Sequence, residues 1–149
     1  MSEAKQRIDR FEKPKPDLTL EEMKEDLLRY VEEYDWVSIA ELKRRYGDQA
    51  NGDYLWVTDS DDNMVFYAGL SRQMLSALWD LLGEKKVHLH PASFLTYLVD
   101  GGVLVFPLVR NPPRGGYKKL HWLPICLRPG AKCALRNCPS RLIDEASQK

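Results

Sequence analysis

Two of the three histidines occur in a pattern that could bind metal. His88 and His90 are separated by one residue on a predicted strand, so both side chains point to the same face. Together with His121 they could hold zinc and leave a fourth position open for water. No feature of the sequence brings His121 to the pair, and no carboxylate lies beside them to fix a tautomer. We therefore expect solvent-facing or core-edge histidines and no bound metal, with a zinc-dependent hydrolase as an alternative.

The three cysteines do not have the spacing of common zinc sites. Six residues separate Cys126 from Cys133 and four separate Cys133 from Cys138, where a zinc knuckle has two. An odd number of cysteines without an export signal favours reduced thiols over disulfides. Basic neighbours would lower the pKa of an exposed thiol in this region. We expect free thiols in a tail, with a reactive cysteine as the alternative.

An acidic stretch matches only the opening of a calcium-binding loop. Asp59, Asp61 and Asn63 stand at alternate positions, as the first ligands of an EF-hand do. Met64 then replaces the required glycine and Leu70 the final glutamate, which excludes calcium binding of this type. The acidic residues are better explained as the solvated turn of a hairpin.

No nucleotide-binding or hydrolase motif occurs in the chain. Walker A, G-x-G-x-x-G, G-x-S-x-G and H-E-x-x-H patterns are all missing. The paired glycines at residues 101–102 and 115–116 fall in predicted turns. We therefore expect no cofactor and no enzymatic activity, although a nuclease built from scattered Asp, Glu and Lys would leave no such motif.

Charge is divided unevenly along the sequence. Residues 1–102 contain 13 Lys or Arg against 20 Asp or Glu, a net charge of −7. Residues 103–141 contain eight Lys or Arg and no acid, a net charge of +8, and the last eight residues add −1. Such an asymmetry indicates a polyanionic partner at one end of the molecule, or charge complementarity within the chain.

Aromatic residues lie next to this positive charge. Residues 117–122 read Tyr-Lys-Lys-Leu-His-Trp, an order that could stack on bases or hold a nucleic-acid backbone. Aromatic residues in strands more often pack in a core. We expect Trp122 to lie in the core and keep Tyr117 as a candidate contact residue.

Three helices are predicted in the first half of the sequence. Thr19 and Glu22 form a capping box ahead of apolar residues that recur every three or four positions. Ser38 with Glu41 gives a second start of the same kind, and Ser71 opens a third helix. The three predicted helices cover residues 20–34, 38–46 and 71–83.

The remaining elements are predicted as strands. Residues 54–57 and 64–67 flank the acidic turn and should form a hairpin inserted between the second and third helices. Asp100 and Gly101 predict a tight hairpin turn, and residues 111–116 a longer loop. An antiparallel β-meander should therefore end an α+β domain, with strands at 87–90, 94–99, 103–109 and 119–127, of which 94–99 could also be a short helix.

The ends of the chain and its apolar runs bear on its location. We expect a flexible arm at residues 1–17, one domain at 18–128 and a partly ordered basic tail at 129–149. The first residues contain no apolar core of a signal peptide, and no run reaches the length of a membrane span. An intracellular, cytoplasmic protein that does not enter membranes is expected.

Three capped helices followed by strands and a basic loop resemble the winged helix-turn-helix superfamily over residues 18–127. This resemblance implies that the third helix enters the major groove, with Arg72 and Gln73 as base readers. It also implies a wing along the phosphate backbone, which would place four phosphate contacts in residues 110–119. The connection between the second and third helices, at 24 residues, is longer than the few that a compact helix-turn-helix uses. The implied wing contacts are Arg110, Arg114, Lys118 and Lys119, and Tyr117 is the DNA-contact candidate kept from the aromatic pattern above.

The resemblance implies a DNA-binding protein, either a transcriptional regulator or an accessory factor, with double-stranded DNA as partner. A homodimer is a further expectation, since Leu27, Tyr30 and Trp36 could supply an interface between two copies. The alternative is a protein-interaction adaptor without enzymatic activity. In that case the aromatic hairpin at residues 54–67 would bind the partner, and the basic segment would face an acidic protein surface.

Overall fold

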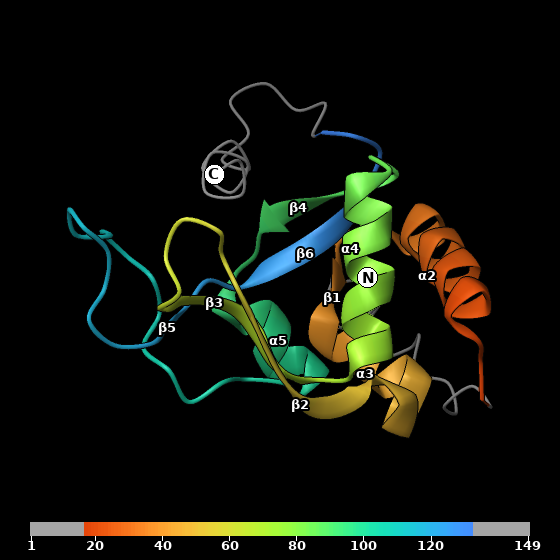
Figure 1. Cartoon of the computed structure of the whole chain (residues 1–149), viewed down its shortest axis with the longest axis horizontal. Coiled ribbons are helices and arrows are strands. Elements are labelled where there is room, and N and C mark those ends of the chain that lie inside the picture. Colours follow the sequence, from red (N-terminus) through yellow and green to blue (C-terminus); the bar gives the residue numbers. More distant parts are fainter. Residues whose placement is uncertain (1–16, 133–149) are drawn as a thin grey trace.

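The computed structural model describes residues 17–132, and the arm and most of the tail predicted above lie outside this part. In it, helices and strands alternate along the chain, and the strands of two small sheets lie beside the helices (Figure 1). No helix of residues 17–132 has the length and apolar character needed to cross a membrane. The helical elements are α2 (Leu20–Tyr34), α3 (Ile39–Tyr46), the 3-10 turn η1 (Gly47–Ala50), α4 (Arg72–Gly83) and α5 (Phe94–Asp100).

The strands form two three-stranded sheets, so the α+β class is confirmed. One sheet has the order β1-β6-β4 and is antiparallel, and the other has the order β2-β3-β5 with β5 parallel to β3. Since β5 and β6 belong to different sheets, the predicted meander is wrong. The strands are β1 (Val37–Ser38), β2 (Asn51–Val57), β3 (Met64–Leu70), β4 (Val87–Pro91), β5 (His121–Trp122) and β6 (Ile125–Pro129).

Helices α2, α3 and α4 lie at the three predicted positions, but strands β1, β2 and β3 lie between them, so the helices do not all precede the strands. The hydroxyl of Thr19 accepts a hydrogen bond from the Glu22 amide at 3.2 Å, and the Glu22 carboxylate accepts one from the Thr19 amide at 3.0 Å. Ser38 and Ser71 cap α3 and α4 in the same way. Glu41 differs from the expected box, because its buried carboxylate accepts a hydrogen bond from the Tyr30 hydroxyl at 2.8 Å.

The segment at residues 94–99 is a helix, so the predicted strand and the tight turn after it are wrong. The hydroxyl of Ser93 caps α5, and Gly101 ends it with a φ of 79° in the left-handed region. A left-handed glycine after a helix satisfies its last carbonyl groups. The Asp-Gly pair therefore acts as a helix end, and the alternative of a short helix was the correct one.

The predicted strands at residues 103–109 and 119–127 are corrected as well. Residues 103–107 join no strand, and Leu108 makes a single parallel bridge with Trp122. Pro124 separates β5 from β6, so the second prediction divides into two strands that turn to different sheets. The hairpin of β2 and β3 is confirmed.

Most residues of the two predicted contact surfaces, the interface between copies and the aromatic hairpin, are buried in the core. Leu27 and Tyr30 are buried, so these two residues cannot supply the predicted interface between copies. On the hairpin, Trp56 packs edge-on against Phe66 in the core, which leaves Tyr54 and Leu55 as the exposed apolar residues of β2. Three of the four aromatic side chains of the hairpin, those of Trp56, Phe66 and Tyr67, are therefore buried, and only Tyr54 is exposed.

Trp122 is buried, as expected, at the point where the two sheets meet. Its indole N–H donates a hydrogen bond to the carbonyl of Phe66 at 3.1 Å, and its ring packs edge-on against Tyr97 at 5.0 Å. Tyr97 in turn donates to the carbonyl of Ile125 on β6. These contacts hold the start of β6, the end of β5 and helix α5 together.

The turn between α2 and β1 is held by an arginine from the far end of the chain. Asp35 and Trp36 have positive φ values of 56° and 49°, a conformation that costs non-glycine residues about 1–3 kcal/mol each. Arg128 on β6 donates hydrogen bonds of 2.9 and 2.8 Å to the Asp35 carboxylate and stacks 4.1 Å above the Trp36 ring. Partial burial alone would raise the pKa of Asp35, but the hydrogen bonds from Arg128 and the Trp36 amide hold it below its usual range. One cation of the basic segment is therefore used within the chain.

The chain leaves α5 through a glycine that packs against α3 and β3. A Cβ atom on Gly102 would lie 2.3 Å from both the Ala40 Cβ and the Tyr67 hydroxyl. We expect Gly102→Ala to lower the free energy of unfolding by about 1–3 kcal/mol, because the packed neighbours must shift. Urea denaturation measures the change. Gly83→Ala is the control, since nothing lies within 4 Å of its Cβ position, and an equal loss in both variants would contradict the prediction.

Candidate nucleic-acid interface

Residues 110–119, here called the basic loop, carry four exposed cations. Arg110, Arg114, Lys118 and Lys119 lie on this excursion between the 103–109 segment and β5. None of the four forms an ion pair with any of residues 17–132. Their charge is thus available to a partner, unlike that of Arg128. These four and Tyr117, five of the predicted contact residues, therefore lie on one loop of the chain.

The acidic turn of the hairpin holds the base of the basic loop. The Asp61 carboxylate accepts a hydrogen bond from the Tyr117 amide at 2.9 Å, and the Asn63 side chain donates to the Tyr117 carbonyl at 2.7 Å. The backbone of His121 also donates to the Asn63 carbonyl at 2.7 Å. Gly116, with a φ of 89°, allows this approach, because a Cβ there would lie 2.9 Å from an Asp61 oxygen. The solvated turn inferred from the sequence therefore has a positioning role.

Tyr117 closes the loop from inside. Its ring stacks on His121 with centroids 3.7 Å apart and an angle of 17°, and its hydroxyl accepts a hydrogen bond from the Arg110 amide at 3.2 Å. A ring nitrogen of His121 lies 2.8 Å from the Lys119 carbonyl. These contacts join the two ends of the loop. Tyr117 is half-buried in them and so helps to present the cations on either side of it.

This arrangement predicts that the loop depends on Asp61. We expect Asp61→Ala to raise the exchange rate of the Tyr117 amide hydrogen by about tenfold or more, because a hydrogen bond to a charged acceptor contributes about 1.5–3 kcal/mol. NMR-detected hydrogen exchange measures this at the single amide. Asp62→Ala removes an exposed charge from the same turn and should leave the rate unchanged. Equal exchange rates of the Tyr117 amide in the unchanged protein, Asp61→Ala and Asp62→Ala would show that Asp61 does not hold the loop.

Helix α4 presents a different kind of surface. Arg72 is exposed at its start, but the side-chain amide of Gln73 donates a hydrogen bond to the Leu18 carbonyl at 2.8 Å. Further along the helix, Trp79 is 55% exposed and Asp80 forms an ion pair with Lys24 at 3.4 Å. In Figure 1 the hairpin lies between α4 and the basic loop, which projects at the left edge. Arg72 and Gln73 are thus not brought together with the loop cations.

The histidines do not form the zinc site that was considered. His88 and His90 lie on β4 and His121 lies on β5, in different sheets. Among residues 17–132, no group of three His, Cys, Asp or Glu side chains could hold a metal ion. His88 and His90 are buried, where solvent-facing or core-edge positions were expected, and the His90 ring packs edge-on against Trp36 at 4.5 Å.

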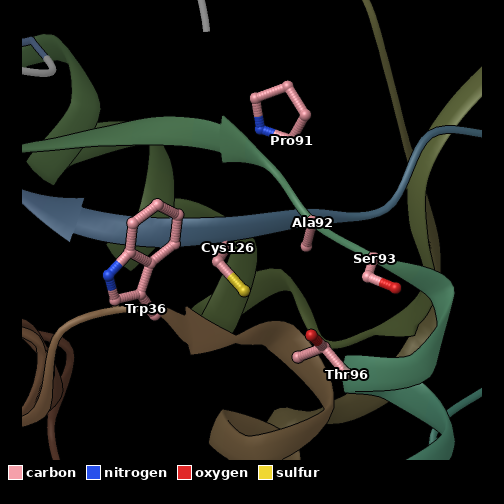
Figure 2. Close-up of a pocket in the computed structure, with 6 residues that line it drawn as sticks. All are labelled: Trp36, Pro91, Ala92, Ser93, Thr96 and Cys126. Carbon is pink, nitrogen blue, oxygen red and sulfur yellow. The ribbon is translucent and has the colours of Figure 1, made fainter. Parts of the chain in front are cut away.

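Cys126 is buried at the floor of a small pocket of about 250 Å³. Figure 2 shows its sulfur directed into the pocket between Trp36 and Thr96, with Ser93 at the far side. The lining contains a thiol and two hydroxyl groups but no histidine, carboxylate or lysine that could act as a general base there. Cys126 is therefore a core residue and not part of a tail. Cys133 and Cys138 lie outside the described residues.

No protein-family model, curated protein or solved structure matches this chain. The described surface offers exposed cations and hydrogen-bond donors on the basic loop, and these suit the binding of a polyanion.

Proposed function

We propose that this chain is a DNA-binding protein that uses the basic loop to hold the phosphate backbone of duplex DNA. The observation that carries the proposal is the set of four exposed cations without an acidic partner in residues 17–132, on a loop tied at both ends. Phosphate contacts from lysine and arginine supply most of the affinity in sequence-independent DNA binding. A loop that is already ordered loses less conformational entropy when it binds.

The order of elements supports a winged-helix-like arrangement. The strand β1 lies between α2 and α3, and α4 is followed by β4, α5, the basic loop, β5 and β6. Strands β1, β6 and β4 form one antiparallel sheet, with β6 in the middle. Winged helix domains share the plan of three helices with a sheet that carries a wing. Under this interpretation the β2–β3 hairpin is an insertion that supports the wing, and α5 lies within the wing itself.

The surface of α4 favours an accessory factor over a sequence-reading regulator. Arginine, asparagine and glutamine side chains read base edges in the major groove. On α4 the Gln73 amide is hydrogen-bonded to Leu18, which leaves Arg72 as the only arginine, asparagine or glutamine on that helix outside such a contact. Binding through phosphate contacts would therefore show little preference among DNA sequences.

The double variant Arg114→Ala with Lys118→Ala tests the proposal. We expect it to weaken binding to random-sequence duplex DNA and to every other duplex alike, and to reduce the slope of log K against log salt by about two, one for each lost phosphate contact. Fluorescence anisotropy with the full chain measures both quantities. Lys85→Ala with Lys86→Ala removes the same charge outside the loop and is the matched control. Equal binding by the two double variants would contradict the proposal.

A protein-interaction adaptor is the second candidate, and a different observation favours it. The hairpin expected to bind a partner buries three of its four aromatic side chains, whereas exposed apolar side chains gather on α5 and on the segment that follows it. This surface is separate from the four-cation set except at Arg110, and its occupant is considered next.

A further inference from the structure

Exposed apolar side chains are concentrated in one short stretch of the chain. Of the nine large exposed hydrophobic residues in the described part, five fall within residues 94–105. Single exposed apolar residues are ordinary, whereas a gathered patch marks a contact surface. Leu95 and Leu98 on α5 are 61% and 56% exposed, and Val105 beyond it is 95% exposed. The others are Phe94 and Val103.

A groove of about 390 Å³ runs beside this patch, between the start of α5 and residues 103–110. This apolar groove is wide enough for a few aliphatic or aromatic side chains. Arg110 is its only charged lining residue and forms no ion pair within the described part of the chain. Its lining residues are Phe94, Val103, Leu104, Phe106, Pro107, Leu108, Arg110 and Trp122.

The backbone groups and the charge beside the groove indicate which kind of molecule it could bind. The backbone groups of residues 103–106 make no hydrogen bond with the rest of residues 17–132, so they can pair with the backbone of a bound chain. Residues 101–132 contain no Asp or Glu, and Arg110 stands beside the apolar lining. A nucleic-acid backbone cannot use such a lining, since its phosphates require cations and hydrogen-bond donors.

We propose that the apolar groove binds a peptide segment of a protein partner that carries two or more large apolar side chains next to carboxylates. The apolar side chains fill the groove over Val103 and Phe106, and a carboxylate pairs with Arg110. This inference does not rest on DNA binding, because Arg110 is the only one of the four cations of the basic loop that also lines the groove.

Selection from a random library of twelve-residue peptides tests the chemistry directly. The full chain is the target, and the full chain with Val103→Asn is used for counter-selection. Val103 is 42% exposed, so this neutral change should leave the fold intact, which denaturation can verify. We expect the enriched peptides to contain several large apolar residues and to carry net negative charge.

Variants then place the bound peptide. Val103→Asn should lower the affinity of the protein for the enriched peptides, measured by fluorescence anisotropy, by about tenfold or more, because apolar contact area is lost. Arg110→Ala should weaken them severalfold, while Arg114→Ala and the exposed control Tyr54→Asn should change their affinity less than about twofold. For duplex DNA the pattern is opposite, with an effect of Arg114→Ala and none of Val103→Asn. The two proposals therefore fail independently.

Three results would overturn the inference. The first is a lack of enrichment over the Val103→Asn target. The second is enrichment of basic or uncharged peptides. The third is enriched peptides that ignore Val103→Asn but are weakened by Arg114→Ala, which would place them on the basic loop.

Discussion

Raising the salt concentration from about 50 mM to about 200 mM is expected to weaken binding of the full chain to random-sequence duplex DNA by about a hundredfold. Four phosphate contacts, one for each cation of the basic loop, give a slope of log K against log salt of about −3.6. A fourfold rise in salt then lowers the association constant by slightly more than two powers of ten. Anisotropy titrations at four or five salt concentrations measure the slope.

The slope separates the proposed interface from two others. A value near −1 would mean that a single cation contacts the DNA, and the basic loop would not be the interface. A value near −7 would require cations beyond the loop, such as those of the segment that ends at residue 141. Absence of binding even at the lower salt would leave the peptide-binding adaptor as the leading function.

The second large effect concerns stability. Asp26→Ala is expected to lower the free energy of unfolding by about 3–5 kcal/mol, because it leaves a partly buried arginine without its partner. Asp26 is buried on α2 and accepts hydrogen bonds from Arg45 at 2.8 and 3.0 Å and from the Tyr46 hydroxyl at 2.8 Å. Burial and the nearby Asp26 charge raise the pKa of Tyr46. Partial burial would by itself lower the pKa of Arg45, but its pairing with Asp26 raises it.

The neighbouring residue provides the control. Glu25→Ala removes an exposed carboxylate from the same helix and should change the stability by less than about 0.5 kcal/mol. Urea denaturation of both variants, followed by circular dichroism, measures the difference. If Asp26→Ala and Glu25→Ala unfolded at the same urea concentration, the cluster would contribute nothing to the fold.

Local features of the fold could be predicted from the sequence, and long-range ones could not. The caps at Thr19, Ser38 and Ser71 lie within three residues of the groups they bind, so the helix starts are visible in the sequence. The sequence of α5 is compatible with both a strand and a helix, because a short stretch with five apolar residues in seven fits either. The pairing of β3 with β5 and of β1 with β6 joins distant residues and has no local signature.

The same limit applies to the candidate site. The cations of the basic loop are evident from composition, and the structure does bring them together with Tyr117. The sequence did not predict that Asp61 and Asn63 position the basic loop, because 56 positions separate Asp61 from the Tyr117 amide that it holds. The acidic turn and the glycine pair were each recognised as turns, but nothing in the sequence indicated that the two turns meet. The engagement of Gln73 with Leu18 was equally hidden.

The central position of β6 bears on how this protein is made. Both β1 and β4 find their antiparallel partner only in β6, which is the last described strand to leave the ribosome. Before residues 125–129 emerge, the first helices have been synthesised, but the sheet beside them still lacks its middle strand. Assembly of this sheet therefore waits until residues 125–129 have been synthesised, and a nascent chain arrested before residue 125 should remain open to proteases that spare the finished molecule.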